Sequence, residues 1–133
     1  MTHGLDTSVV VRLLIGAPAD QAEAARRALA AQPRGSFAVS DLVVGESYFA
    51  LRHHYAVPHG EAVSALLALL TDPRVMSTGA AKSALTHMPG RESGAGFMDR
   101  LIHASYQADD VTMLTFDRAA ARLPGTQLVS SRL

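Results

Sequence analysis

The chain has 133 residues, 48% of them hydrophobic and 18% charged, which predicts one globular domain over residues 1–133 rather than a disordered chain. Twelve basic residues balance twelve acidic ones, so net charge gives no indication of a nucleic-acid partner. The absence of cysteine excludes a disulfide framework, a thiolate metal site and a cysteine nucleophile.

The N-terminus and the apolar segments indicate where in the cell the protein is expected to reside. Residues 1–6 read MTHGLD, with a carboxylate where a signal peptide needs its apolar stretch. The longest apolar runs, such as Val9–Ile15 interrupted by Arg12, are far shorter than the roughly 20 residues that span a bilayer. We therefore expect a cytoplasmic protein with no membrane partner.

The order of predicted elements alternates short strands with helices. The elements expected in the first half are a strand ending near residue 6, helices over 9–15 and 20–32, a strand over 37–39, and helices over 41–56 and 59–71. Those expected in the second half are a strand over 75–76, helices over 79–87 and 95–108, a strand over 111–116, a short helix over 117–123 and an edge strand over 127–129. The run Val111–Phe116 is apolar without alternation, which is typical of a strand covered on both faces. The pattern predicts an α/β fold, a three-layer sandwich with a mostly parallel central sheet.

Two aspartates follow predicted strands. Asp6 and Asp117 would lie beyond the carboxyl ends of parallel strands, where ligands collect in such sheets. Each also has a structural explanation, because Asp is a preferred N-cap and favours the positive end of a helix.

Two further acids lie on predicted helices. Glu46 shares an apolar stripe with Leu42, Val43 and Phe49, and a buried carboxylate needs a partner, a proton or a metal ion. A salt bridge to an arginine across the core is the structural alternative for Glu46. Asp99 stands in the early turns of the helix over 95–108, where favourable interaction with the helix dipole is the alternative.

Together the four carboxylates suggest a metal site. Carboxylates supply the hard oxygen ligands that Mg²⁺ or Mn²⁺ prefers, and a cluster of them is repulsive without a cation. Such bound metal can activate water and stabilise the leaving oxygen in phosphodiester cleavage. This chemistry requires no Cys, Ser or His nucleophile.

Four segments in order and spacing resemble one family. They read LDTS at 5–8, SDLVVGE at 40–46, GFMDRLI at 96–102, and LTFD at 114–117 with ARLPG at 121–125. This series resembles PIN-domain ribonucleases of the VapC toxin type over nearly the whole chain. The resemblance implies a metal-dependent ribonuclease that acts on RNA, with Asp6, Glu46, Asp99 and Asp117 as catalytic Mg²⁺ or Mn²⁺ ligands. It also implies that Ser8 supports the site beside Asp6.

The resemblance further implies a cognate antitoxin that blocks the acidic pocket, and a PIN homodimer. The run of leucines over 66–70 is wider than one helical stripe, which fits a helix buried on more than one side. One departure from the family pattern is Gly96, at a position where many members carry a further acid.

Other readings of the same residues remain. A haloacid-dehalogenase phosphatase requires a second Asp where Ser8 stands, and a response-regulator receiver requires a late-strand lysine, for which Lys82 is badly placed. Six histidines invite a zinc site, but only Asp99 and His103 share a helix face at i,i+4, with no third ligand at a suitable spacing. The main alternative is a non-catalytic PIN-like domain that binds protein or RNA.

Overall fold

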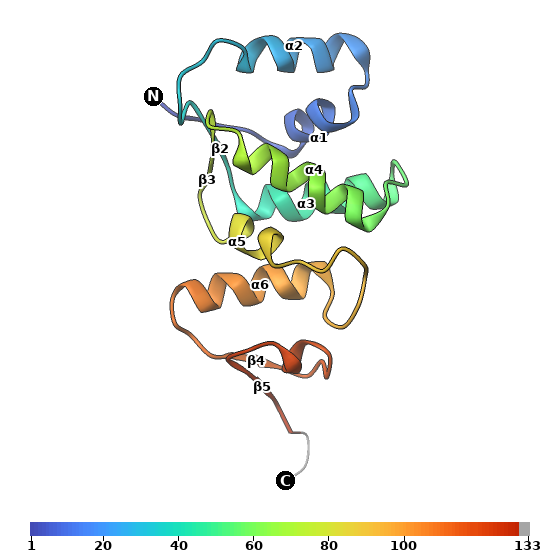
Figure 1. Ribbon diagram of the computed structural model, residues 1–133, viewed down its shortest axis with the longest axis vertical. Helices are drawn as coiled ribbons and strands as arrows, with labels where there is room; N and C mark the ends of the chain where they lie inside the picture. The colour runs from blue at the N-terminus through green and yellow to red at the C-terminus, as the bar shows by residue number, and fades with distance from the viewer. Residues whose placement is uncertain (131–133) are drawn as a thin grey trace.

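The computed structural model describes residues 1–130 and is shown in Figure 1. Its elements in chain order are β1 His3–Gly4, α1 Thr7–Ile15, α2 Ala19–Leu29, β2 Phe37–Val39, α3 Asp41–His53, α4 His59–Thr71, β3 Val75–Ser77, α5 Ala81–Thr86, α6 Phe97–Ala108, β4 Met113–Thr115, the 3₁₀ turn η1 Ala120–Arg122 and β5 Thr126–Leu128.

Local capping chemistry sets several of these boundaries. The Asp6 carboxylate accepts the Val9 N–H and begins α1, and Gly16 ends that helix in the left-handed conformation with φ 78°. The α3 helix ends at His53, three residues before the predicted Ala56. The reason is that Ala56 itself adopts a left-handed φ of 52°, which a continuing right-handed helix does not allow.

Within residues 1–130, all strand pairing is parallel. β2 pairs with β1 on one side and β3 on the other, and β4 pairs with β5 in a separate sheet. Parallel strands alternating with helices confirm the predicted α/β class. The strands are nevertheless divided between two sheets, and Figure 1 shows β4 and β5 beyond α6, at the opposite end of the molecule from α1 and α2.

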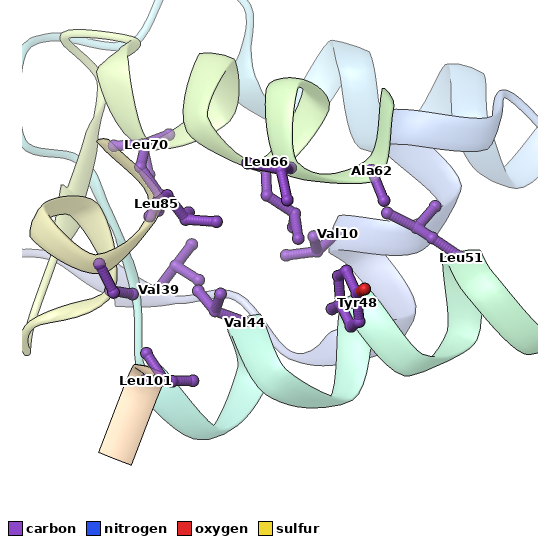
Figure 2. Packing of buried hydrophobic residues seen from close by; sticks show 14 of the residues in the cluster. Val10, Val39, Val44, Tyr48, Leu51, Ala62, Leu66, Leu70, Leu85 and Leu101 are labelled. Carbon is purple, nitrogen blue, oxygen red and sulfur yellow. The ribbon is translucent and has the colours of Figure 1, made fainter. Parts of the chain in front are cut away.

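The main core lies between α1, α3, α4, α5 and the larger sheet. Figure 2 shows its central residues, among them Val10 from α1, Leu51 from α3 and Leu66 from α4. Leu66 and Leu70 are almost completely buried, and the other two leucines of the run, Leu67 and Leu69, are half-buried against the same cluster. This arrangement agrees with the expectation that α4 is buried on more than one side.

The C-terminal segment packs in a second, smaller cluster. Its buried members are Ala95, Met113 and Ala120, with Leu123 packed against them. The expectation that residues 111–116 form a strand covered on both faces is wrong for this chain, because Leu114 is 64% exposed and Phe116 is 74% exposed. The physical reason is that β4 pairs only with β5 within residues 1–130 and so lies away from the main core.

Across residues 1–130, no helix combines the length and the hydropathy needed to cross a bilayer.

Candidate active site

Asp6 stands between β1 and α1 and is exposed to solvent. The Ser8 hydroxyl donates to Asp6 Oδ1 at 2.6 Å, and the Val9 N–H donates to the same oxygen at 3.1 Å. The Ser8 hydrogen bond, followed by that from Val9, lowers the pKa of Asp6 below its ordinary value. Asp6 is therefore an N-cap and at the same time a carboxylate that its neighbours stabilise in the ionised form.

Glu46 lies on α3 and is exposed, so the expectation that it is buried on an apolar stripe is wrong. The stripe itself is exposed: Leu42 and Phe49 are 77% and 50% accessible, since no other described element covers this face of α3. The suggested salt bridge to an arginine does not form within residues 1–130. Instead the Thr7 hydroxyl donates to Glu46 Oε1 at 3.1 Å, which links Glu46 to the residue next to Asp6.

Asp99 lies in the first turn of α6, which packs against α3. Glu46 borders a hollow of about 490 Å³ together with Thr7, and Asp99 borders an adjacent hollow of about 270 Å³. Phe49 and Met98 border both hollows. The two acids therefore occupy neighbouring parts of one surface formed by α3 and α6.

Asp117 follows β4 and shapes its own turn. Its Oδ1 accepts the Ala120 N–H at 2.9 Å, and its backbone N–H donates to Thr115 Oγ1 at 3.0 Å. Asp117 therefore follows a strand of the smaller sheet, whereas Asp6 follows β1 of the larger sheet. The structure thus links Glu46 with Thr7, the residue after Asp6, and places Asp99 on the adjoining helix, whereas Asp117 follows a strand of the other sheet.

The four carboxylates are suitable ligands for a divalent cation, because each supplies hard oxygen donors. Their arrangement is incomplete: within residues 1–130, no three Asp, Glu or His side chains converge closely enough to hold a metal ion.

Gly96 is the N-cap of α6, with φ −68° and ψ 169°. The expected helix over residues 95–108 therefore begins two residues later, at Phe97. A negative φ allows any residue at this position. A Cβ at Gly96 would lie 3.9 Å from Asp99 Oδ2, which places this position beside the predicted metal ligand even though it is outside the helix.

A buried polar cluster beside α6 was not predicted from the sequence. The Tyr48 hydroxyl lies 2.7 Å from His59 Nδ1, and His59 Nε2 lies 2.9 Å from the Pro89 carbonyl oxygen. Since a carbonyl only accepts, Nε2 carries the proton, and in the neutral ring Nδ1 accepts from the tyrosine hydroxyl. Tyr48 also stacks on Phe97 with ring centroids 3.8 Å apart. These contacts fasten the loop that leads into α6 and so position Asp99. Sequence spacing offers no signal for them, because they join α3, α4 and a distant loop.

Comparison with known proteins identifies a family for this chain. The chain matches the PIN domain over residues 5–125, a range that includes all four candidate acids. No curated protein matched the sequence. PIN domains are a family of nucleases and generally use divalent metal ions. Because the match covers most of its length, the chain belongs to the PIN-domain family.

Proposed function

We propose that this chain is a metal-dependent ribonuclease of the VapC type, the toxin of a toxin–antitoxin pair. The observation that carries this proposal is the link between Asp6 and Glu46. Asp6 lies at the carboxyl end of a parallel strand, where ligands collect in such sheets, and its neighbour Thr7 holds Glu46 by a hydrogen bond. Both carboxylates are exposed and so are accessible to a cation and to RNA.

The roles of the chain's own residues follow from their contacts. Asp6, Glu46, Asp99 and Asp117 would hold Mg²⁺ or Mn²⁺, which when bound activates water and stabilises the leaving oxygen of a phosphodiester. Ser8 holds the Asp6 carboxylate ionised and in a fixed rotamer. The Thr7 hydroxyl donates to Glu46 Oε1 and so orients the Glu46 carboxylate.

Exposed apolar side chains beside the acids suggest a surface for a protein partner. Leu42 and Phe49 flank Glu46 on α3, and a monomeric soluble protein rarely leaves large apolar residues grouped in this way. We propose that a cognate antitoxin covers this face and blocks the acidic surface, and that the toxin acts as a homodimer.

The test is RNA cleavage by the purified full chain, with and without Mg²⁺ or Mn²⁺. Cleavage is expected only with metal, and Asp6→Asn is expected to abolish it while circular dichroism stays unchanged, because asparagine remains a good N-cap. Asp20→Asn is the matched control, since Asp20 is an exposed first-turn acid of α2. Full activity in Asp6→Asn would refute the assignment.

The second candidate is a non-catalytic PIN-like domain that binds protein or RNA. The placing of β1 and β4 in separate sheets, and the lack of three converging acid or histidine side chains within residues 1–130, favour it. RNA binding without metal-dependent cleavage in the same assay would establish this alternative.

A further inference from the structure

One group of side chains separates the two hollows that Glu46 and Asp99 border. Phe49, His53 and Met98 line both hollows, and we call these three side chains the ridge. Of the two hollows, Glu46 borders the larger one, of about 490 Å³, and Asp99 borders the smaller one, of about 270 Å³. A ligand that contacts both carboxylates therefore lies across the ridge.

Two of the three ridge residues carry flat aromatic rings that solvent reaches. Phe49 is 50% exposed, and His53 is also exposed. Their ring centroids are 5.3 Å apart and their ring planes are tilted by 31°, an arrangement that follows from their i,i+4 spacing on α3. The Phe49 ring also stands edge-on to that of the buried Tyr48, with centroids 6.4 Å apart. The pair is therefore an exposed aromatic surface that a core residue supports.

Two local features of the sequence place the ridge next to both acids. Phe49 follows Glu46 by three residues, so their Cβ atoms lie on one face of α3, about 5 to 6 Å apart. Met98 directly precedes Asp99 on α6 and lies over Gly45 of α3, where a Cβ would be 2.8 Å from the Met98 sulfur. A side chain at Gly45 would displace Met98. The glycine therefore allows the ridge and Asp99 to lie together.

The chemistry around the ridge fits a nucleotide. Aromatic rings offer the π faces on which an unpaired RNA base stacks. The last turn of α3 is basic, with Arg52 and His53, and Arg52 borders the same hollow as Asp99. Arg52 pairs with Glu92 at 2.8 Å, but the Glu92 side chain is 63% exposed. Ion pairs so open to solvent contribute little, so an RNA phosphate can replace that carboxylate.

We propose that Phe49, with His53 beside it, is a stacking platform for an unpaired base of the RNA substrate. The choice of RNA as the ligand rests on the proposed function. Because bases inside a duplex are already stacked on their neighbours, the platform selects single-stranded segments such as loops and ends. Phe49 is then a specificity-determining residue that contacts the substrate beside the acids.

Tryptophan fluorescence tests the stacking without any activity measurement. The native chain has no tryptophan, so Phe49→Trp places a single reporter ring on the ridge, and Asp6→Asn in the same full-length chain keeps the probe from being cleaved. The probes are oligoadenylate, oligouridylate and the duplex that these two form. Each single strand is expected to quench the fluorescence, because a stacked base contacts the ring directly. The duplex is expected to leave the fluorescence unchanged.

Met76→Trp, also with Asp6→Asn, is the matched control. Met76 on β3 is 46% exposed and borders neither hollow, so a tryptophan there should respond to none of the probes. The proposal would be overturned if the Phe49→Trp chain responded to neither single strand, or responded equally to the duplex. An equal response of the Met76→Trp chain would overturn it too. The ridge would then be a surface for a protein partner only.

Binding affinities separate ring stacking from general apolar contact. In the Asp6→Asn background, Phe49→Leu keeps an apolar side chain but removes the ring. It should weaken single-strand binding roughly 5- to 150-fold, which corresponds to about 1 to 3 kcal/mol for one stacked base. Phe49→Tyr keeps the ring and should bind as the unsubstituted residue does. Leu42→Ala removes an exposed apolar side chain from the same hollow and should change binding little, so an equal loss in that variant would overturn the platform.

Cleavage by the wild-type chain distinguishes this inference from the proposed function. Quenching in the Phe49→Trp chain together with an inactive wild type would refute the ribonuclease and leave the platform as part of an RNA-binding domain. Cleavage by the wild type together with an unresponsive Phe49→Trp chain would overturn the platform but not the ribonuclease.

Discussion

Replacing Gly96 by aspartate adds a carboxylate beside Asp99 at a position where the backbone accepts it. Gly96 is the N-cap of α6 with a negative φ, and a Cβ there would be 3.9 Å from Asp99 Oδ2. Apart from the two neighbouring residues in the chain, no other atom lies within 4 Å of that Cβ position. The substitution therefore acts through charge and capping rather than through steric strain.

In the metal-free protein, the better N-cap raises the free energy of unfolding, whereas the added charge lowers it. Aspartate at an N-cap is better than glycine by only a few tenths of a kcal/mol. Two unit charges about 4 Å apart repel by about 1 kcal/mol in bulk water and by about 4 kcal/mol at an effective dielectric constant of 20, and these figures are upper bounds here because the new carboxylate extends beyond the Cβ position and can rotate away from Asp99. Gly96 is exposed and Asp99 is half-buried, so the lower figure applies. The free energy of unfolding should fall by roughly 0.5 to 1 kcal/mol without metal.

A bound cation removes that repulsion and gains an oxygen ligand. Relief of about 1 kcal/mol plus one additional contact predicts roughly tenfold tighter Mn²⁺ binding, since 1.4 kcal/mol corresponds to a factor of ten. Isothermal titration with Mn²⁺ measures this change. Gly96→Asn is the matched control, because it supplies the cap without the charge. Unchanged or weaker affinity in a folded Gly96→Asp variant, or an equal gain in Gly96→Asn, would refute the reasoning.

Three further outcomes are expected. Mn²⁺ should raise the melting temperature of the wild-type chain, less so at acidic pH where protons compete for the carboxylates, and an equal rise in Asp99→Asn would show that the ion binds elsewhere. Ser8→Ala removes the main cause of the lowered pKa of Asp6, so the carboxylate protonates at higher pH. The stability that the lowered pKa of Asp6 contributes is present above its unfolded pKa and lost as pH falls, so Ser8→Ala should be less stable than the wild type at pH 7 and should approach it on acidification below about pH 4. Its cleavage should be lost at a higher pH than that of the wild type, because its carboxylate protonates earlier, and coincident acid limbs of cleavage would contradict this. Tyr48→Phe keeps the ring stack on Phe97 but leaves His59 Nδ1 without its partner, which should cost about 1 to 3 kcal/mol in urea unfolding, whereas an unchanged midpoint would mean that water replaces the hydroxyl.

Much of the local structure was predictable from the sequence, because its causes are local. The N-cap Asp6, the helix-ending Gly16 and the apolar period of α4 each act within a few residues of the chain. Strand β2 and helix α4 have the predicted bounds. The family resemblance likewise depends on an ordered series of short segments, and the match over residues 5–125 confirms it.

The environment of each acid was decided only by tertiary structure. The apolar neighbours of Glu46 at i−4, i−3 and i+3 indicated that Glu46 is buried. Burial depends, however, on whether another element covers that face of α3, and none does within the described chain. Asp6 and Asp117 occupy equivalent places after their strands, but strand neighbours are set by long-range pairing that spacing along the chain does not encode. The structure places β1 and β4 in separate sheets, an assignment that the similar positions of Asp6 and Asp117 after their strands do not reveal.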